Sequence, residues 1–242
     1  MLPNDPEISH LWYSGIDTSF LQITNIFETP ILLSTTEYFV QASRTFPNIL
    51  STIFSANNDH HGNMFDISII NSIIINGFDL NIDAGETTIE IYYKAGTYLG
   101  FETDATAWTF LESQAITGLG TDVPAHIDIS NLFLNAGETY ALYISSTNSI
   151  EMNYTTLSSL ETFADENLQI TTGAGKEYPF GQTFSPRRWN GTIYYTSLSN
   201  CQSNLVCDTV FVSVPTNDLS IVAANSPTTG YNLTNSEMVN VE

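Results

Sequence analysis

Hydrophobic and polar side chains alternate along most of this sequence with a period of two residues. The alternating runs are rich in Ile, Thr, Tyr and Phe, and each run is bounded by Gly, Asn, Asp or Pro. Because successive side chains of a β-strand point to opposite faces, such a run predicts a strand with one face in a core and the other in water. The clearest runs cover residues 78–82, 88–93, 126–130 and 140–144.

Helical periodicity is weak by comparison. Residues 103–111 and 158–167 are long enough for a turn or two of helix, but neither segment carries a sustained apolar stripe. Many short strands with one polar face are typical of antiparallel sheets that pack into a sandwich or close into a barrel. We therefore predict an all-β chain whose main unit is a jelly-roll-like antiparallel β-sandwich.

The charge balance narrows the classes of partner. The 242 residues include 26 acidic and 5 basic side chains, for a formal net charge of -21. Binding to nucleic acid requires clusters of Lys and Arg, so it is excluded as a main function, and the same charge argues against docking on an anionic membrane surface. Hydrophobic residues make up 42% of the chain, which is enough for a packed core, whereas charged residues make up only 13%. A surface built mainly from Ser, Thr, Asn and Gln is typical of extracellular β proteins.

The ends of the sequence and its cysteines suggest how the protein is processed. No apolar stretch reaches the roughly 18 residues of a membrane-spanning helix, and residues 1–7 lack the basic and apolar regions of a signal peptide. For a chain this acidic and poor in Lys, we interpret the missing signal as truncation of a longer secreted protein. In an oxidising compartment the only two cysteines, Cys201 and Cys207, are expected to form a local disulfide.

Catalytic and metal-binding motifs are absent from the sequence. It contains no nucleophile elbow, zinc-protease, P-loop or dinucleotide-binding pattern, so we expect a protein that is not an enzyme and has no cofactor. Calcium stays open, because extracellular β modules often bind it, but no acidic run has EF-hand spacing and no ligands can be assigned. We expect His10 and His126 to face outward from strands and the pair His60-His61 to lie in a solvated turn.

One basic cluster stands out in this acidic chain. Arg187 and Arg188 precede Trp189, and two interpretations are open. The cluster could bind a sugar or an acid, because Trp stacks on sugar faces and Arg donates to hydroxyls and carboxylates. Alternatively, Arg187 pairs with a carboxylate at the edge of the core, such as Asp66 or Asp79, while Trp189 packs between sheets.

The first part of the chain resembles a known module. Segments 10–13, 21–26 and 37–42 predict three strands. They resemble the Ig-like modules that are repeated in giant secreted proteins of Bacteroidota, and the resemblance places the closing strand of such a module at residues 201–214. The matching residues are Trp12-Tyr13, Thr29-Pro30, Leu33, Thr35-Thr36 and Tyr38-Phe39-Val40. The resemblance implies an incomplete, discontinuous Ig-like host module at residues 1–45 and 200–215, with the strand at 37–42 pairing with the closing strand.

The intervening residues resemble a second Bacteroidota surface module, so residues 46–199 are expected to form an inserted β-sandwich. Residues 216–242 resemble the first strands of an adhesion-type β-sandwich, which implies that the chain was cut from something longer. The second module is recognised by GNMFDI at 62–67, INGFD at 75–79, IEIYYKAGTYLGFET at 89–103, AWTFL at 107–111 and YPFGQTFSPRRWNGTIYY at 178–195.

These resemblances imply a function as well as a fold. They are to giant cell-surface adhesins of gliding Bacteroidota, which are exported by the type IX secretion system. The implied role is non-catalytic: attachment or gliding outside the cell, with neighbouring modules, surface polysaccharide or the secretion and gliding machinery as partners. In the implied source, an Asp-Thr-aliphatic context makes Thr209 a candidate for O-glycosylation. The alternative is a carbohydrate-binding accessory module of a secreted hydrolase, which requires exposed aromatic residues on one sheet face.

Overall fold

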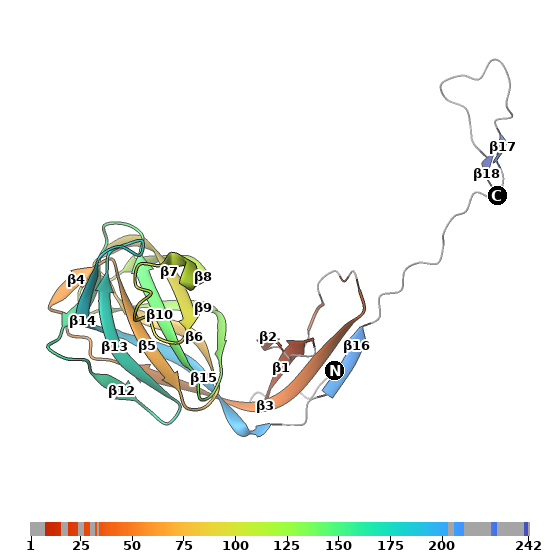
Figure 1. The fold of residues 1–242 in the computed structure, drawn as a ribbon, viewed down its shortest axis with the longest axis horizontal. Coiled ribbons are helices and arrows are strands. Elements are labelled where there is room, and N and C mark those ends of the chain that lie inside the picture. The colour runs from red at the N-terminus through yellow and green to blue at the C-terminus, as the bar shows by residue number, and fades with distance from the viewer. Residues whose placement is uncertain are drawn as a thin grey trace, which may run out of the picture.

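Two large antiparallel sheets face each other and form a β-sandwich (Figure 1). The structure is a computed structural model that describes residues 8–15, 19–23, 27–29, 32, 34–202, 206–210, 224–226 and 240–241. The helical element among these residues is a single 3₁₀ turn, η1 (Ala105–Ala107), which lies in the segment where the sequence allowed a turn of helix. The predicted all-β antiparallel sandwich is confirmed.

The first sheet combines strands from the N-terminal and the C-terminal parts of the chain. Strand β16 (Val206–Val210) pairs with β3 beside the main path of this sheet. In their spatial order, the strands of that path are β2 (Ser19–Ile23), β1 (Ile8–Ser14), β3 (Thr36–Ser51), β15 (Gly191–Gln202), β6 (Ile73–Asn81) and β9 (Pro124–Leu134).

The second sheet forms the other layer of the sandwich. Strand β12 (Thr162–Ala164) pairs with β13 beside the main path of this sheet. Strands β17 (Ala224–Ser226) and β18 (Asn240–Val241) belong to neither layer and pair with each other. In their spatial order, the strands of the main path are β4 (Asn58–His60), β11 (Met152–Thr156), β14 (Thr183–Trp189), β13 (Leu168–Lys176), β5 (Gly62–Ile69), β10 (Thr139–Ser146), β7 (Gly85–Ala95) and β8 (Thr109–Gly118).

The hydrophobic core lies between the two sheets. Alternate residues of each strand point into it, such as Phe78 and Leu80 of β6 in the first sheet and Phe65 and Ile67 of β5 in the second. Trp189 lies between the layers, where its ring stacks on Phe65 at 4.6 Å and meets Phe78 edge-on at 6.1 Å. The period-two alternation of the sequence is therefore the pattern of a two-layer core.

Two long strands continue beyond the sandwich. Residues 45–51 of β3 pair with β15 in the sandwich, whereas residues 36–44 pair with β1, with β16 and, at Ser43, with the last residue of β15 in the extension seen in Figure 1. The predicted pairing of residues 37–42 with the closing strand is confirmed, because Val40 lies opposite Val206 and Phe39 opposite Cys207. β3 continues without a break across residue 45, and the division into a host and an inserted module stays a prediction.

The outer face of the first sheet has an apolar end and a polar end. At the apolar end Leu11 of β1 packs with Ile74 of β6 and Leu198 of β15. Phe20 of β2 stacks on Phe133 of β9 with ring centroids 4.6 Å apart. The small N-terminal strands therefore pack against the sandwich at this end, and the polar end of the same face carries the groove described next.

Candidate functional site

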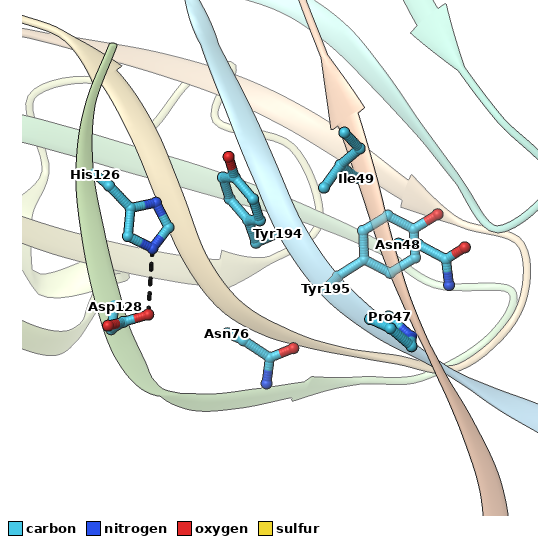
Figure 2. A pocket seen from close by; sticks show the side chains of 8 residues that line it. All are labelled: Pro47, Asn48, Ile49, Asn76, His126, Asp128, Tyr194 and Tyr195. Atoms are coloured by element: carbon cyan, nitrogen blue, oxygen red, sulfur yellow. Dashed lines mark hydrogen bonds and ion pairs between the residues drawn. The ribbon is translucent and has the colours of Figure 1, made fainter. Parts of the chain in front are cut away.

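A shallow groove with a cavity volume of about 360 Å³ lies on the outer face of the first sheet. It crosses the four neighbouring strands β3, β15, β6 and β9, and Figure 2 shows the side chains along it. This volume is within the usual range of small-molecule sites, which is roughly 300–1,000 Å³. The lining residues are Pro47, Asn48, Ile49, Asn76, His126, Asp128, Tyr194 and Tyr195.

A β-bulge in β6 shapes the middle of the groove. Gly77 of β6 pairs with Tyr194 of β15, and Ile75 pairs with Tyr195, which is the next residue of β15. Asn76 therefore has no partner on β15 and is the extra residue of the bulge. A Cβ atom at Gly77 would lie 2.7 Å from the carbonyl oxygen of Ile127 and 3.4 Å from the His126 ring. The bulge therefore re-aims one side chain, and the glycine lets β9 approach closely.

The bulged Asn76 is held in place by its neighbours on both sides. Its Nδ2 donates to Asn131 Oδ1 at 2.9 Å, and its Oδ1 accepts from Thr196 Oγ1 at 2.8 Å. A side-chain amide has two N–H groups and two lone pairs on its oxygen, so half of this capacity stays available to a ligand.

Asp79 connects the two rings of the groove from a position that is only 14% exposed. Its Oδ1 lies 2.8 Å from His126 Nδ1, and its Oδ2 accepts a hydrogen bond from Tyr194 Oη at 2.8 Å. The two rings meet edge to face, with centroids 4.7 Å apart at 86°. The hydrogen bond to Asp79 raises the pKa of Tyr194, because deprotonation would place a phenolate against a carboxylate. Tyr194 is thus a neutral ring in a fixed orientation.

His126 joins two carboxylates. Besides its contact with Asp79, its Nε2 lies 3.2 Å from Asp128 Oδ1, as the dashed line in Figure 2 shows. Neutral imidazole has one N–H, so donating to both carboxylates requires the protonated ring. Partial burial lowers the pKa of His126, but the hydrogen bonds to Asp79 and Asp128 outweigh it and the net pKa is raised. The protonated form is therefore favoured in this setting.

The two sides of the groove differ in polarity. On the β3 side, Pro47 and Ile49 are exposed, and the Ile49 residue is 60% accessible. On the β9 side lie His126 and the Asp128 carboxylate, whose side chain is 90% exposed. Tyr194 lies between them (Figure 2). Such a surface fits a ligand that has an apolar face and several hydroxyl or amide groups at its edges.

The polar side chains of the groove are connected to one another by hydrogen bonds. His126 bonds to Asp79 and Asp128, and within the described part of the chain no hydroxyl or thiol nucleophile is paired with it. Among the same residues no group of three or more His, Cys, Asp or Glu is placed to hold a metal ion. What the groove offers is a set of oriented donors and acceptors beside a neutral ring.

The sequence analysis did not bring these residues together. It placed His126 on an outward strand face, and the structure agrees, but it did not group His126 with Asn76, Asp79 and Tyr194. Period-two alternation does show that such residues point outward. The sequence has no signal for the adjacency of β15, β6 and β9, since these strands begin at residues 191, 73 and 124.

Of the two interpretations of Arg187, Arg188 and Trp189, the sugar-binding one is wrong for the tryptophan. Trp189 is 1% exposed and packs between the sheets, so its ring cannot stack on a ligand. Arg188 is buried and pairs with Glu161 at 3.0 Å, and its other terminal nitrogen donates to Thr155 Oγ1 at 3.0 Å. The cluster is structural because its tryptophan is needed in the core.

The alternative for this cluster is correct for Trp189 and wrong for Arg187. Arg187 donates to the carbonyl oxygen of Pro186 at 2.9 Å and lies over the Tyr154 ring, 5.7 Å from its centroid. It reaches neither of the proposed carboxylates. Asp79 belongs to the first sheet, and Asp66 accepts hydrogen bonds from the hydroxyl of Thr97 and the backbone N–H of Tyr98 instead.

The prediction for His10 was wrong, and the prediction for the pair His60-His61 was correct only in part. His10 is buried rather than outward-facing, because it shares a face of β1 with Trp12, and Phe27 covers that face by stacking on the Trp12 ring at 5.3 Å. His60 ends β4 and is half-buried, with its ring stacked on Phe184 at 5.2 Å and its Nδ1 2.9 Å from His61 Nδ1. His60 therefore belongs to an edge strand of the second sheet, whereas the half-buried His61 lies at the bend between β4 and β5.

The predictions for Cys201, Cys207 and Thr209 fall on side chains outside the described part of the structure. The backbone of Cys207 lies opposite Phe39 of β3, and the residue after Cys201 lies opposite Ser43. Four residues along a strand span about 13 Å, whereas a disulfide needs Cα atoms within about 7 Å. Closing the bond would therefore require this backbone to rearrange, and both the disulfide and the O-glycan stay predictions.

Lys176 is a buried basic residue of the second sheet, and its pKa makes the burial testable. It is fully buried at the end of β13, where its Nζ donates to the carbonyl oxygen of Gly181 and to Thr183 Oγ1. Burial lowers its pKa to about 8, although Glu102 and Glu177 oppose the shift. Between this value and the ordinary 10.5, the unfolded chain binds more protons than the folded one, so the contribution of Lys176 to stability rises with pH.

We therefore expect the stability difference between the wild type and Lys176→Met to depend on pH. From pH 7 to pH 9.5 it should shift in favour of the wild type by about 1–2 kcal/mol, measured by urea unfolding. Below pH 8 both states carry the proton and the cost of the buried charge is fully present. Parallel pH profiles for the two proteins would contradict the assignment.

Comparisons with known proteins identify no family. No family model matches the chain, and no curated protein matches it. Similar solved structures include that of the infectious bursal disease virus Gt strain, with 13% identity and a TM-score of 0.22, covering 86% of this chain and 66% of that one. Another is the infectious bursal disease virus VP2 subviral particle, with 12% identity and a TM-score of 0.20, covering 84% of this chain and 59% of that one. At these TM-scores the likeness carries no argument. Within the described residues no helix is long and apolar enough to cross a membrane.

Proposed function

We propose that this chain is a non-catalytic adhesive segment of a secreted cell-surface protein, and that its groove holds a glycan chain. The resemblance to Bacteroidota adhesins supports the setting, which includes type IX secretion, surface attachment and gliding. The groove supports the ligand class. In this proposal the sandwich serves as a rigid platform, and attachment depends on the outer face of the first sheet.

The groove itself is the observation that carries the proposal. Sugars have apolar ring faces with hydroxyl groups around their edges, so a matching site combines an aromatic or aliphatic surface with oriented polar groups. Tyr194 and Ile49 provide the first kind of surface, and Asn76, His126 and Asp128 provide the second. The open form of the groove across four strands suits an extended chain better than a small molecule enclosed on all sides.

A carbohydrate-binding accessory module of a secreted hydrolase is the second candidate function. This alternative requires exposed aromatic residues on one sheet face, and the aromatic residue that the groove offers is the half-buried Tyr194. The two candidates share the groove and differ in the polypeptide that surrounds it. Hydrolysis of the bound glycan by the native full-length protein, purified from its source, would favour the accessory module.

The test is glycan binding by the intact 242-residue chain. It should bind one or more oligosaccharides on a glycan array, and Tyr194→Ala should weaken the best of these at least tenfold in calorimetry. Tyr194→Phe should lose less, because it keeps the ring and gives up only the hydrogen bond to Asp79.

Phe110→Ala is the matched control for this test. Phe110 is an exposed aromatic residue of β8 in the second sheet, so its removal should leave binding unchanged. Thermal unfolding should show that all three variants are folded. If the wild type binds no glycan, or if Tyr194→Ala binds as tightly as the wild type, the proposal is wrong.

A further inference from the structure

The charges in the groove point to the chemical class of the glycan. The charged residues at the groove are Asp79, Asp128 and His126, and the lining contains no Lys or Arg. The four basic residues with described side chains, Lys94, Lys176, Arg187 and Arg188, all lie on strands of the second sheet.

The three charged side chains do not cancel one another. His126 lies between the two carboxylates, so its protonated ring offsets one negative charge and leaves the other. Asp79 is almost enclosed and is already bonded to His126 and Tyr194. Asp128 is 90% exposed and bonds through one oxygen only, so the uncompensated charge faces the space that a ligand would occupy.

We propose that the groove selects uncharged glycans and rejects acidic ones, and that Asp128 is the specificity-determining residue. This inference rests on the proposed function, because it assumes that a glycan occupies the groove. A sugar carboxylate placed beside Asp128 would face a like charge, the lining contains no Lys or Arg, and the cationic His126 ring already lies between two carboxylates. A hydroxymethyl group in the same position can donate a hydrogen bond to the free oxygen of Asp128.

The net charge of the chain adds to the same preference. At -21, the molecule repels a polyanion before contact, and this repulsion is screened by salt over about a Debye length. A site for uronates or sulfated sugars would need Arg or Lys to bind the acidic groups, and this groove provides neither.

The experiment compares hexasaccharides that differ only at C6. Hexamers of glucose, mannose and galactose are measured beside hexamers of glucuronate, mannuronate and galacturonate of the same linkage. At low salt, the neutral member of the pair that fits the groove should bind at least tenfold more tightly than its uronate. The ratio should fall toward one as salt is raised from about 20 mM to about 0.5 M, because the discrimination is electrostatic.

Substitutions test whether Asp128 is the discriminating group. Asp128→Lys should reduce the ratio or reverse it, and Asp128→Asn should reduce it while the neutral hexamer remains bound. Glu138→Lys is the control, since it makes the same charge change at an exposed turn residue that does not line the groove. It should leave the ratio nearly unchanged.

The outcomes separate this inference from the proposed function. If no hexamer of either kind and no glycan on the array binds, the proposed function fails. If hexamers bind but a uronate binds as tightly as its neutral partner, only the inference on charge fails. A ratio that does not change in Asp128→Lys or Asp128→Asn would also overturn the role of Asp128.

Discussion

Trp189→Ala is expected to lower the free energy of unfolding by about 3–5 kcal/mol, the range for removing a large aromatic residue from a core. The ring lies between the two sheets, stacked on Phe65 and edge-on to Phe78, and it is 1% exposed. Its loss leaves a cavity where the layers meet, and strands that are paired on both sides cannot collapse to fill it. A loss of this size is a large part of the stability of a typical domain.

Urea unfolding of the wild type and the variant provides the measurement. Trp189→Phe should lose less, because it keeps an aromatic ring and because the indole Nε1 has no hydrogen-bond partner in the described structure. Leu160→Ala, at an exposed position, is the control and should change stability by less than about 0.5 kcal/mol. A loss below 1 kcal/mol for Trp189→Ala would show that the ring does not support the contact between the sheets.

Gly173→Ala should cost about 3 kcal/mol, although it adds only one methyl group. Gly173 lies in β13, where a Cβ atom would be placed 2.1 Å from the carbonyl oxygen of Met64 and 3.0 Å from the Cα atom of Phe65. These are backbone atoms of β5, which is held by β10 on its other side, so the strand cannot move away freely. Overpacking against a fixed backbone is among the costliest small substitutions.

Gln169→Ala in the same strand is the matched control for Gly173→Ala. Gln169 is half-buried and lies opposite Ser68 of β5, so its substitution tests the strand without the close approach. It should change stability by less than about 1 kcal/mol. Equal losses for the two variants would mean that the strand, and not the close backbone approach, accounts for the cost.

The two sheets of the sandwich differ in where their charged and polar side chains lie. The second sheet contains the four basic residues with described side chains, and most of them make internal contacts, such as the pairing of Arg188 with Glu161 and the bonds of Lys176 to the turn beside it. The first sheet leaves the polar part of its outer face open. Glycan binding, if the experiments above support it, would therefore depend on only one of the two layers.

The sequence by itself was sufficient to predict the all-β antiparallel sandwich. Alternation with a period of two is a local property, so residues 78–82 and 88–93 reveal both their strand conformation and their buried faces. The pairing of residues 37–42 with the closing strand was also predicted correctly, although the matched segment is 206–210. The outward orientation of His126 follows from the same local rule.

Only the tertiary structure decided which outward-facing residues meet and which strand residues are covered. The basic cluster shows this most clearly. A Trp in an alternating strand can point into the core or out to solvent, and Trp189 points into the core, where its ring stacks on Phe65. The burial of His10 likewise depends on packing by another part of the chain and not on any local pattern. The groove depends on pairing among strands that lie more than 40 residues apart in the chain, and on a bulge that re-aims Asn76. The spatial order of the strands and the position of a bulge depend on the packing energy of the whole sandwich. Neither can be predicted from the residues of one strand alone.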